Sequence, residues 1–499
     1  MQDTSGYWLS LRAAYNVGMA FIRRVKTSSG ATAIQIAYKE YGKIKRIKHI
    51  GSAHNPEEET VLMDLARQRL YANQLLLFAD TTPALKFSLK SSCSGLLRRV
   101  LLEQFHRLGF HQLADETFAL LCIARIVEPT SKLDSLRVLA DLGVNHIDKN
   151  RLYRCLKRII DQDYRKTVSQ LCFDYAANRN LSLILYDVTT LYFEVQQEDS
   201  YRKPGLSKER RLEPQIIVGL LVDQSGFPLG LHSFEGNTAE TKTILPVVEA
   251  FCFQHHVHQI TVVADAAMLS VKNLSALAEA GHRYIVGSRL HKIPYDIANY
   301  QKSQPLSDRQ IITSQHEKYR IVYQYRVKRA ALDLKNIQKQ VAKAQKIING
   351  QTSISKAKFL TVKAKTKKLN QVLIDKAYAL AGIKGYVTNL DIPDQQVIDY
   401  YHQLFQVEAS FRMVKSDFKA RPIFHRKRDS IEAHLTIVLT ALAMGKSIES
   451  QTGMSIKHLV KTLRPVRSGI VVINGQEYIA DEDISPVIHT LLQKLRSGH

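Results

Sequence analysis

Two short apolar runs, each followed at once by an aspartate, constrain the fold of this chain more than any other feature of its sequence. Residues 181–186 precede Asp187, and residues 260–264 precede Asp265. Runs of this length and composition are typical of buried strands. A carboxylate at the end of such a strand is costly to bury unless it is paired or bound to a metal ion. We therefore expect both aspartates to lie at the same site.

A third acid lies on a later amphipathic helix, which we predict from about residue 395 to residue 419. The apolar stripe of this helix consists of Leu404, Val407, Phe411, Val414 and Phe418. Glu408 falls about one residue to the side of the stripe, at the border between core and solvent. The helix pattern alone favours an exposed Glu408–Arg412 ion pair. The two aspartates instead favour a shared site of three carboxylates.

Three carboxylates are the kind of ligand set that suits a hard cation such as Mg²⁺ or Mn²⁺. Two such ions can activate a water molecule and stabilise the leaving oxygen in phosphodiester cleavage. The sequence has no GxxxxGK[ST] loop, so we expect no nucleotide cofactor. His255, His256 and His258 lack acid or cysteine partners at metal-ligand spacing, and we interpret them as surface residues.

The charge of the chain indicates a polyanionic partner. Its 499 residues carry a formal net charge of +24, which most simply indicates nucleic acid. An acidic membrane surface is the alternative, but the sequence has no long uncharged apolar segment. Residues 281–390 hold 22 Lys+Arg and 5 Asp+Glu, which is 22 − 5 = +17 of the total. We interpret them as a basic insertion in the catalytic fold, or alternatively as a solvated arm that only neutralises phosphates.

The five cysteines are scattered and form no CxxC pair, which indicates a reducing compartment without disulfides or a zinc finger. No signal peptide is evident at the start of the sequence. Met19 would make a natural start, so we expect residues 1–18 to be an upstream extension.

Residues 19–55 have the pattern of β structure, and residues 97–178 have helical periodicity throughout. Within the helical part, residues 131–142 and 149–160 resemble two helices around a turn, which could be a DNA-reading helix-turn-helix. A helical bundle with a solvated basic face is the alternative, and we favour it because such pairs are common in bundles.

Residues 181–290 read as three strands followed by helix, strand, helix and strand, so we predict an α/β fold with a mixed sheet flanked by helices. We divide the whole chain into six segments. They are an N-terminal β-rich segment with a helix (1–90), a helical domain expected to bind DNA (91–180), the first part of the catalytic core (181–290), the basic insertion (291–384), the second part of the core (385–450) and a C-terminal tail (451–499).

The pattern Tyr401-x2-Leu404-x3-Glu408-x6-Lys415 resembles the Tyr–Arg–Glu–Lys motif of bacterial insertion-sequence DDE transposases, with leucine in place of the arginine. The departure leaves open what replaces the contact of that arginine. Further similar stretches are residues 186–190, 264–266, 388–389, 421–425 and 432–435. The resemblance is good over residues 181–450.

The resemblance implies an RNase H-like core in which Asp187, Asp265 and Glu408 hold two Mg²⁺ or Mn²⁺ ions. It implies cleavage at the ends of the element, followed by attack of the freed 3′-OH on target DNA through the same site. Tyr401 and Lys415 are then expected against the terminal phosphates. Arg412, Lys419 and Arg421 are further expected DNA contacts. His425 and His434 beside the helix are expected either to contact phosphate or to be structural histidines.

The expected partner is double-stranded DNA, both as terminal inverted repeats and as target, bound by a homodimer or a larger complex. The expected location is the bacterial cytoplasm, at the nucleoid and away from membranes. Three alternatives stay open: a nuclease on the same core that lacks strand transfer, a catalytically inactive DNA-binding protein derived from a transposase, and an RNA-binding protein. The last is weakened because the sequence has no aromatic RNP-type motif.

Overall fold

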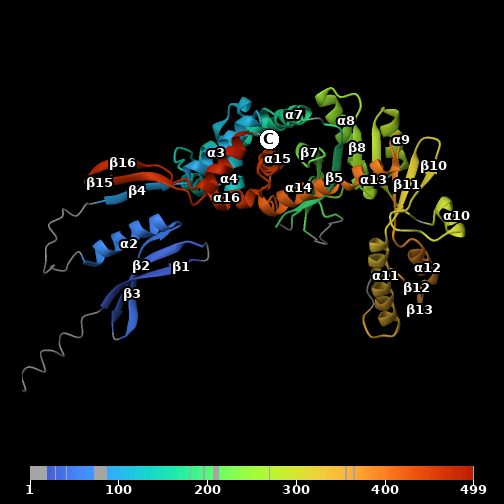
Figure 1. Ribbon diagram of the computed structural model, residues 1–499, viewed down its shortest axis with the longest axis horizontal. Coiled ribbons are helices and arrows are strands. Elements are labelled where there is room, and N and C mark those ends of the chain that lie inside the picture. The colour runs from blue at the N-terminus through green and yellow to red at the C-terminus, as the bar shows by residue number, and fades with distance from the viewer. Residues whose placement is uncertain are drawn as a thin grey trace, which may run out of the picture. The chain divides into compact units, whose positions relative to one another are not determined.

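The computed structural model describes residues 19–27, 30–40, 42–71, 87–179, 181–194, 197–205, 213–268, 270–290, 292–353, 357–363 and 366–497 (Figure 1). The expected upstream extension, residues 1–18, lies outside the described residues. The chain divides into two compact units, each of which is treated by itself. The first contains Met1–Glu103, Asp134–Asp148 and Ile448–His499, and the second contains Gln104–Leu133 and Lys149–Ser447.

The first unit contains two small antiparallel sheets. One consists of β1 (Met19–Lys26), β2 (Thr32–Glu40) and β3 (Lys43–Ala53), and the other of β4 (Phe87–Cys93), β15 (Ser468–Ile473) and β16 (Gln476–Ala480). Helix α2 (Pro56–Tyr71) packs on the first sheet, because Ala66 meets Ile34 and Ile36 of β2 in a shared core. The β structure expected in residues 19–55 is confirmed where it is described. This unit also contains the helices α5 (Ser135–Asp141), α16 (Ile456–Leu463) and α17 (Pro486–Ser497).

Helices precede the main sheet, as the periodicity of residues 97–178 predicted. They are α3 (Gly95–Arg107), the short 3-10 helix η2 (Phe110–Leu113), α4 (Glu116–Val127), α6 (Lys149–Asp161) and α7 (Tyr164–Ala177). Helix α6 packs against α4 and α7, and its Arg158 forms an ion pair of 2.7 Å with Asp115 at the start of α4. The two helices of the possible helix-turn-helix, α5 and α6, belong to different units. The contacts of α6 with α4 and α7 favour a helical bundle over a helix-turn-helix.

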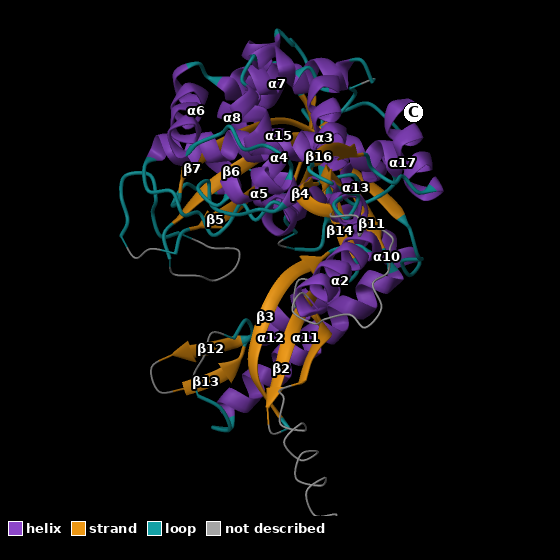
Figure 2. Ribbon diagram, turned by 90° about the vertical axis from the view of Figure 1, so that its left-hand side faces the viewer, coloured by secondary structure: helices purple, strands orange, loops and turns teal. Residues whose placement is uncertain are grey.

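The core of the second unit is a mixed sheet of eight strands in the order β10-β11-β14-β9-β8-β5-β6-β7. Strands β5, β6 and β7 of this sheet are labelled in Figure 2. Its first five strands along the chain are β5 (Ile184–Tyr192), β6 (Gln215–Val222), β7 (Pro228–Glu235), β8 (Thr261–Ala264) and β9 (Arg283–Ser288). Strands β5, β6 and β7 pair antiparallel, whereas β5, β8 and β9 are parallel and are joined through α8 (Ile244–His255) and α9 (Val271–Glu279). The predicted mixed sheet flanked by helices is therefore confirmed.

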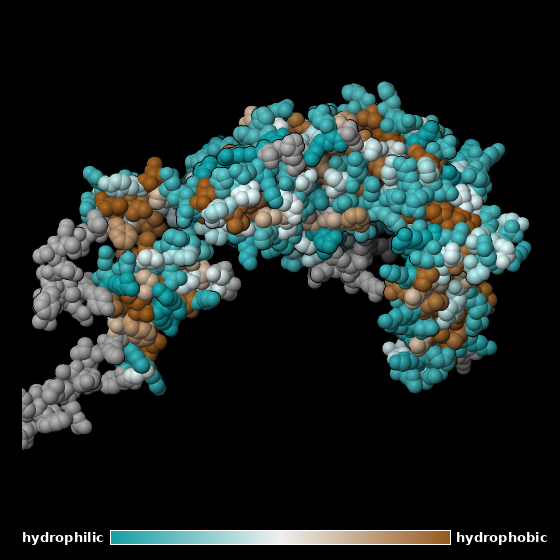
Figure 3. All heavy atoms as spheres, viewed as in Figure 1, coloured by the Kyte–Doolittle hydropathy of each residue, from teal (hydrophilic) through white to brown (hydrophobic). Residues whose placement is uncertain are grey.

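After β9 the chain forms two further strands of this sheet and a separate helical part, and then returns beside β9 as β14. The intervening elements are α10 (Tyr295–Ser303), β10 (Ile311–Gln315), β11 (Arg320–Tyr325), α11 (Val327–Ile348), β12 (Leu360–Lys363), β13 (Thr366–Leu369) and α12 (Gln371–Ala379), and the returning strand is β14 (Ile383–Thr388). Strands β14, β11 and β10 extend the sheet, while Ile337, Phe359 and Ile374 pack into a separate small core. Hydrophobic residues also show among hydrophilic ones over this part in Figure 3. The basic region thus has a packed core of its own.

The acidic helix is interrupted, whereas we predicted one helix over residues 395–419. The structure has α13 (Asp394–His402), α14 (Phe405–Arg412) and a π-helical turn, η5 (Met413–Asp417). The break arises because the backbone N–H groups of Leu404 and Gln406 bond to the carbonyl oxygens three residues earlier, at 3.0 and 2.8 Å. The predicted apolar stripe is confirmed, since all five of its side chains are buried.

Helix α15 (Arg428–Thr452) follows and is the one helix among the described residues that is long and apolar enough to cross a membrane by length and composition. Of its apolar window, 89% is buried inside the protein, and a core helix passes the same test. His255 at the end of α8 is also buried, so its assignment to the surface was wrong. Its ring stacks on Phe173 at 4.4 Å and bonds to Gln170 at 3.0 Å, whereas His256 and His258 are exposed as predicted.

Candidate catalytic site

Neighbouring parallel strands bring Asp187 and Asp265 together. Tyr186 of β5 pairs with Ala264 of β8 as the last pair of their ladder, and each aspartate is the next residue. Asp187 does not end its strand, contrary to our prediction. Strand β5 continues to Tyr192 because residues 188–191 pair with β6 on the other side. Asp187 instead marks the end of the parallel ladder, where Asp265 follows β8.

Glu408 is held over the same sheet by α14, which packs on β5 and β6. The buried hydroxyl of Ser410 donates a hydrogen bond of 2.7 Å to the carbonyl oxygen of Gly226, in the turn between β6 and β7. Gly226 has a φ of 84°, which favours glycine, and a Cβ there would lie 3.1 Å from the carbonyl oxygen of Gln406. This close contact fixes α14 and leaves Glu408 exposed on its surface.

Tyr401 of α13 holds Asp265. The Tyr401 side chain is only 4% exposed, and its hydroxyl donates a hydrogen bond of 3.0 Å to Asp265 Oδ1. Burial raises the pKa of the phenol well above its usual range, and the charges of Asp265 and Asp187 raise it further. The phenol is therefore a permanent donor. Gly287 of β9 leaves the space for it, since a Cβ at that position would lie 2.7 Å from the Tyr401 hydroxyl oxygen.

Lys384 is a site residue that the sequence analysis missed. Its Nζ lies 4.3 Å from the centroid of the Tyr401 ring. Burial lowers the pKa of Lys384 and the charge of Arg329 lowers it further, whereas Asp265 and Glu408 raise it. The ammonium of Lys384 therefore interacts electrostatically with both Asp265 and Glu408. The available signal was a lysine inside the apolar run Ile383–Val387, because lysine is rarely buried without a partner.

A basic wall adjoins these residues. A cavity of about 420 Å³ is lined by Gln324, Arg326, Lys328, Arg329, Lys384, Tyr386 and His402. Four of these seven side chains are cationic: Arg326, Lys328 and Arg329 lie at the start of α11, and Lys384 lies in β14. All four fall within residues 291–384, the predicted basic insertion. Its positive charge is thus partly gathered next to the acids, where it can attract a polyanion.

The three acids fit a hard divalent cation in the kind of atom that they offer, because carboxylate oxygens are preferred by Mg²⁺ and Mn²⁺. They also share one region, since Asp187 and Asp265 both act on Tyr401, and Asp265 and Glu408 both act on Lys384. However, within the part of the chain that the structure describes, no group of three or more His, Cys, Asp or Glu side chains could hold a metal ion as it stands. Asp265 and Glu408 are exposed, so their side chains have room to turn toward an ion.

The predicted DNA contacts lie in two places. Arg412 is exposed at the end of α14, and Lys415 is half-buried in the π-helical turn. Lys419 and Arg421 come after that turn, and both line a different cavity. The guanidinium carbon of Arg421 lies 5.6 Å from the ring centroid of Tyr192, at the far end of β5 from Asp187. The structure therefore brings Tyr401 to the acids and places Lys419 and Arg421 elsewhere.

Comparison with known proteins gives one family match. The family model described as "Transposase DDE domain" matches residues 178–444, a range that includes all three acids. One solved structure with a related outline is the cryo-EM structure of the piggyBac transposase synaptic complex with hairpin DNA. It is 12% identical, the match covers 74% of this chain and 79% of that chain, and the TM-score is 0.39. No curated protein matches the sequence.

Proposed function

The chain belongs to the family of transposases with a DDE domain, and we propose that it moves an insertion sequence by cutting and joining DNA. In this proposal it binds the terminal inverted repeats, cleaves the strand at the end of the element and transfers the freed 3′-OH into target DNA. The observation that carries the proposal is the contact of Tyr401 with Asp265, with Asp187 and Glu408 acting on the same small region.

Asp187, Asp265 and Glu408 would hold the catalytic divalent cations, two Mg²⁺ or Mn²⁺. Such ions, when bound, supply an activated water and stabilise the leaving oxygen. Tyr401 keeps one oxygen of Asp265 in a fixed direction through its hydrogen bond. Lys384 keeps a positive charge beside Asp265 and Glu408, which limits their mutual repulsion and offers an ammonium to a phosphate.

We assign the basic wall, with Arg326 and Arg329, to the phosphates next to the scissile bond. Arginine suits this role because its planar guanidinium binds phosphate through two parallel hydrogen bonds. Arg412, Lys415, Lys419 and Arg421 would hold the DNA backbone on either side of the cut. Because phosphate contacts position DNA without reading its sequence, the recognition of the inverted repeats is assigned to the helical segment, residues 91–180.

Two ends of an element must be joined, so we propose a homodimer or a larger complex on DNA. The proposed location is the bacterial cytoplasm, at the nucleoid. The six predicted segments, with the insertion at residues 291–384 interrupting the catalytic core, form part of the same proposal.

The test is cleavage of DNA that carries the inverted repeats of the element, in Mg²⁺ or Mn²⁺, by the wild type, Asp265→Ala and Asp391→Ala. Asp391 lies exposed in the loop after β14 and serves as the matched control. We expect Asp265→Ala to bind the DNA without cutting it and Asp391→Ala to cut like the wild type. Equal cutting by all three proteins would rule out the role of Asp265.

Two further readouts separate the alternatives. Binding without cutting by the wild type would favour the catalytically inactive DNA-binding protein. Cutting without any product joined to target DNA would favour a nuclease on the same core.

A further inference from the structure

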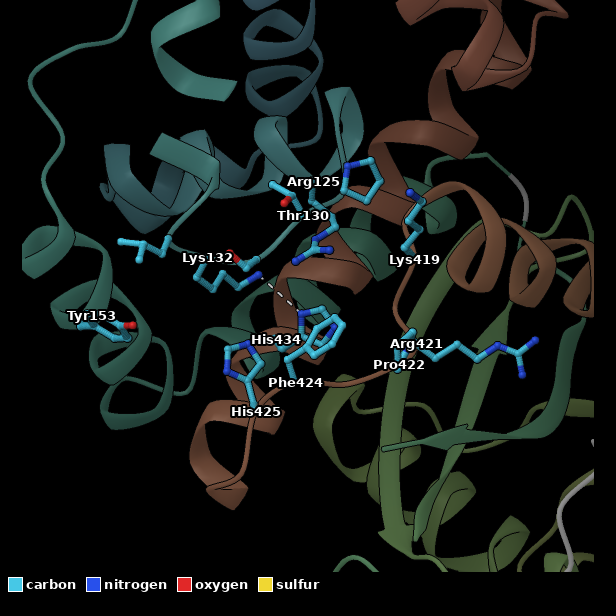
Figure 4. Close-up of a pocket in the computed structure, with 13 residues that line it drawn as sticks. Arg125, Thr130, Lys132, Tyr153, Lys419, Arg421, Pro422, Phe424, His425 and His434 are labelled. Atoms are coloured by element: carbon cyan, nitrogen blue, oxygen red, sulfur yellow. Dashed lines mark hydrogen bonds between the residues drawn. The ribbon is translucent and has the colours of Figure 1, made fainter. Parts of the chain in front are cut away.

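A second cavity, of about 590 Å³, lies apart from the acids, and basic side chains surround it (Figure 4). It is lined by Arg125, Pro129, Thr130, Ser131, Lys132, Leu133, Tyr153, Lys419, Arg421, Pro422, Phe424, His425 and His434. Figure 4 shows Arg125, Lys132, His425 and His434 gathered around one space, whereas the side chain of Arg421 runs away from it. No acidic residue is among the described residues that line this cavity.

Two basic side chains of this cavity, Lys132 and Arg125, are buried, and none of the described carboxylates is paired with either. Lys132 is 5% exposed and Arg125 is 7% exposed. The Nζ of Lys132 lies 3.5 Å from His434 Nδ1, and Arg125 donates a hydrogen bond of 3.5 Å to the carbonyl oxygen of Phe418. Both contacts are long and both partners are neutral. Burial lowers the pKa of Lys132 well below its usual range and that of Arg125 to about 10, so an anion in the cavity would favour the charged forms of both side chains.

The histidines complete an environment that favours an anion. His434 Nε2 lies 3.4 Å from the carbonyl oxygen of Ala420, to which it can donate, so that Nδ1 is free to accept from Lys132. Burial and the charges of Lys132 and Arg125 together lower the pKa of His425 to about 4. The charged groups that act on His425, His434, Lys132 and Arg125 include no carboxylate among the described residues.

We propose that this cavity is a phosphate-binding site, in which Lys132 and Arg125 bind the phosphate oxygens. The buried basic side chains, which no described carboxylate balances, and the space beside them carry the proposal, because phosphate would supply negative charge and several hydrogen-bond acceptors. The two sources of such a group are the DNA backbone and a free phosphate ion. The first source rests on the proposed function, whereas the second does not.

The position of the cavity suits the DNA backbone. The segment that lines it is anchored to β5, because the N–H of Ile423 donates to the carbonyl oxygen of Tyr192 at 3.1 Å. Tyr192 follows Asp187 by 192 − 187 = 5 residues, which is about 17 Å along a strand. That length corresponds to about five base pairs of duplex at 3.4 Å each. A duplex that is cut at the acids and runs along β5 would pass this cavity.

The experiment compares Lys132→Met with the wild type and with Lys272→Met. Lys272 is an exposed lysine of α9, outside the segment assigned to DNA recognition, so its replacement removes the same charge from the surface. The Tm of each full-length protein is measured in potassium phosphate and in potassium chloride of equal ionic strength. DNA affinity is measured over a series of salt concentrations with the same three proteins. Arg125→Gln, a substitution in α4, is put through the same measurements to test the second buried basic side chain.

We expect phosphate to raise the Tm of the wild type and Lys272→Met above the value in chloride, and Lys132→Met to lose this increment. Lys132→Met should keep or raise its own Tm in chloride, because it no longer buries an uncompensated amine. For the DNA backbone as the source, Lys132→Met also weakens DNA binding and lowers the salt slope by about 1. Unchanged DNA binding with a lost phosphate increment identifies a free phosphate ion instead.

The proposal is overturned if phosphate stabilises the wild type no more than chloride does, or if both Lys132→Met and Arg125→Gln keep the increment. Asp265→Ala separates this outcome from failure of the proposed function. Asp265→Ala should show the same rise of the Tm in phosphate as the wild type, although it does not cleave DNA. The rise of the Tm can therefore be measured even if the protein does not cut DNA.

Discussion

The hydroxyl of Tyr401 donates a hydrogen bond of 3.0 Å to Oδ1 of Asp265, and this bond joins the helical layer to the strand end that carries the acid. Asp265 itself is exposed and follows its strand, and the same oxygen also accepts a hydrogen bond of 2.7 Å from the backbone N–H of Ala266. The tyrosine is buried between Lys384 and the sheet, and burial keeps its proton in place. The direction of one carboxylate oxygen is therefore set from outside the trio of acids.

Tyr401→Phe removes only this hydrogen bond. A hydrogen bond to a charged group contributes about 1.5–3 kcal/mol, so we expect DNA cleavage to slow by about 10- to 100-fold. DNA affinity and the Tm should change little, because the ring stays in place. Tyr400→Phe is the matched control, since the hydroxyl of Tyr400 meets Gln396 instead of an acid. Equal cleavage rates of the two variants would contradict the role of Tyr401.

Lys384→Met should change the dependence on the metal ion. The ammonium acts on Asp265 and Glu408, so its loss leaves the acids more negative and a cation more strongly attracted. We expect the Mn²⁺ concentration for half-maximal cleavage to fall by about fivefold. The maximal rate should fall as well, because a phosphate contact is lost. Lys384→Arg keeps the charge and should keep the wild-type metal dependence. A higher Mn²⁺ concentration for half-maximal cleavage by Lys384→Met would contradict the predicted effect of the ammonium on metal binding.

Arg165→Met should destabilise the fold without touching the acids. Arg165 of α7 pairs with Glu432 of α15 at 2.6 Å, and the same carboxylate accepts hydrogen bonds from Tyr201 and Ser233. Both partners are largely buried, so removing one leaves an uncompensated charge at a cost of about 3 kcal/mol. The free energy of unfolding in urea measures this cost. Arg137→Met, which breaks an exposed pair with Asp134, should cost less than about 1 kcal/mol.

His255 should make the protein sensitive to acid. Burial lowers the pKa of His255 to about 4, from the ordinary value of 6.5. Between these two values the unfolded chain binds more protons than the folded chain, so stability is fully present above pH 6.5 and is lost as the pH falls toward 4. We expect a loss of about 2 kcal/mol from this residue between pH 7 and pH 5.

His255→Phe keeps a ring against Phe173 and removes the titrating group. The free energy of unfolding of this variant should therefore fall less between pH 7 and pH 5 than that of the wild type. His256→Phe, at the exposed neighbouring position, should leave the pH dependence unchanged. A pH dependence that is identical in all three proteins would exclude His255 as its source.

The sequence predicted the elements that carry the acids because those elements are governed by local patterns. The apolar runs before Asp187 and Asp265 gave β5 and β8, and the stripe from Leu404 to Phe418 gave the buried face of the acidic helix. The assignment of the three acids to catalysis stays a proposal.

The apolar run around Lys384 could have marked it as unusual, but its place beside the acids could not be predicted. It reaches them only through the pairing of β14 with β9, which no local pattern encodes. The break before α14 has no proline or glycine to announce it. The burial of His255 likewise depends on α7, which is far from it in the sequence.

The insertion between β9 and β14 also delays the synthesis of the third acid. Glu408 is synthesised 408 − 265 = 143 residues after Asp265, which takes about 7 to 30 seconds of translation at 5–20 residues per second. During that interval a growing chain carries two of the proposed ligands without the third. If the three acids have the proposed roles, the catalytic site is complete only after the ribosome has translated the insertion and Glu408. Incomplete chains would therefore leave the DNA of the host uncut.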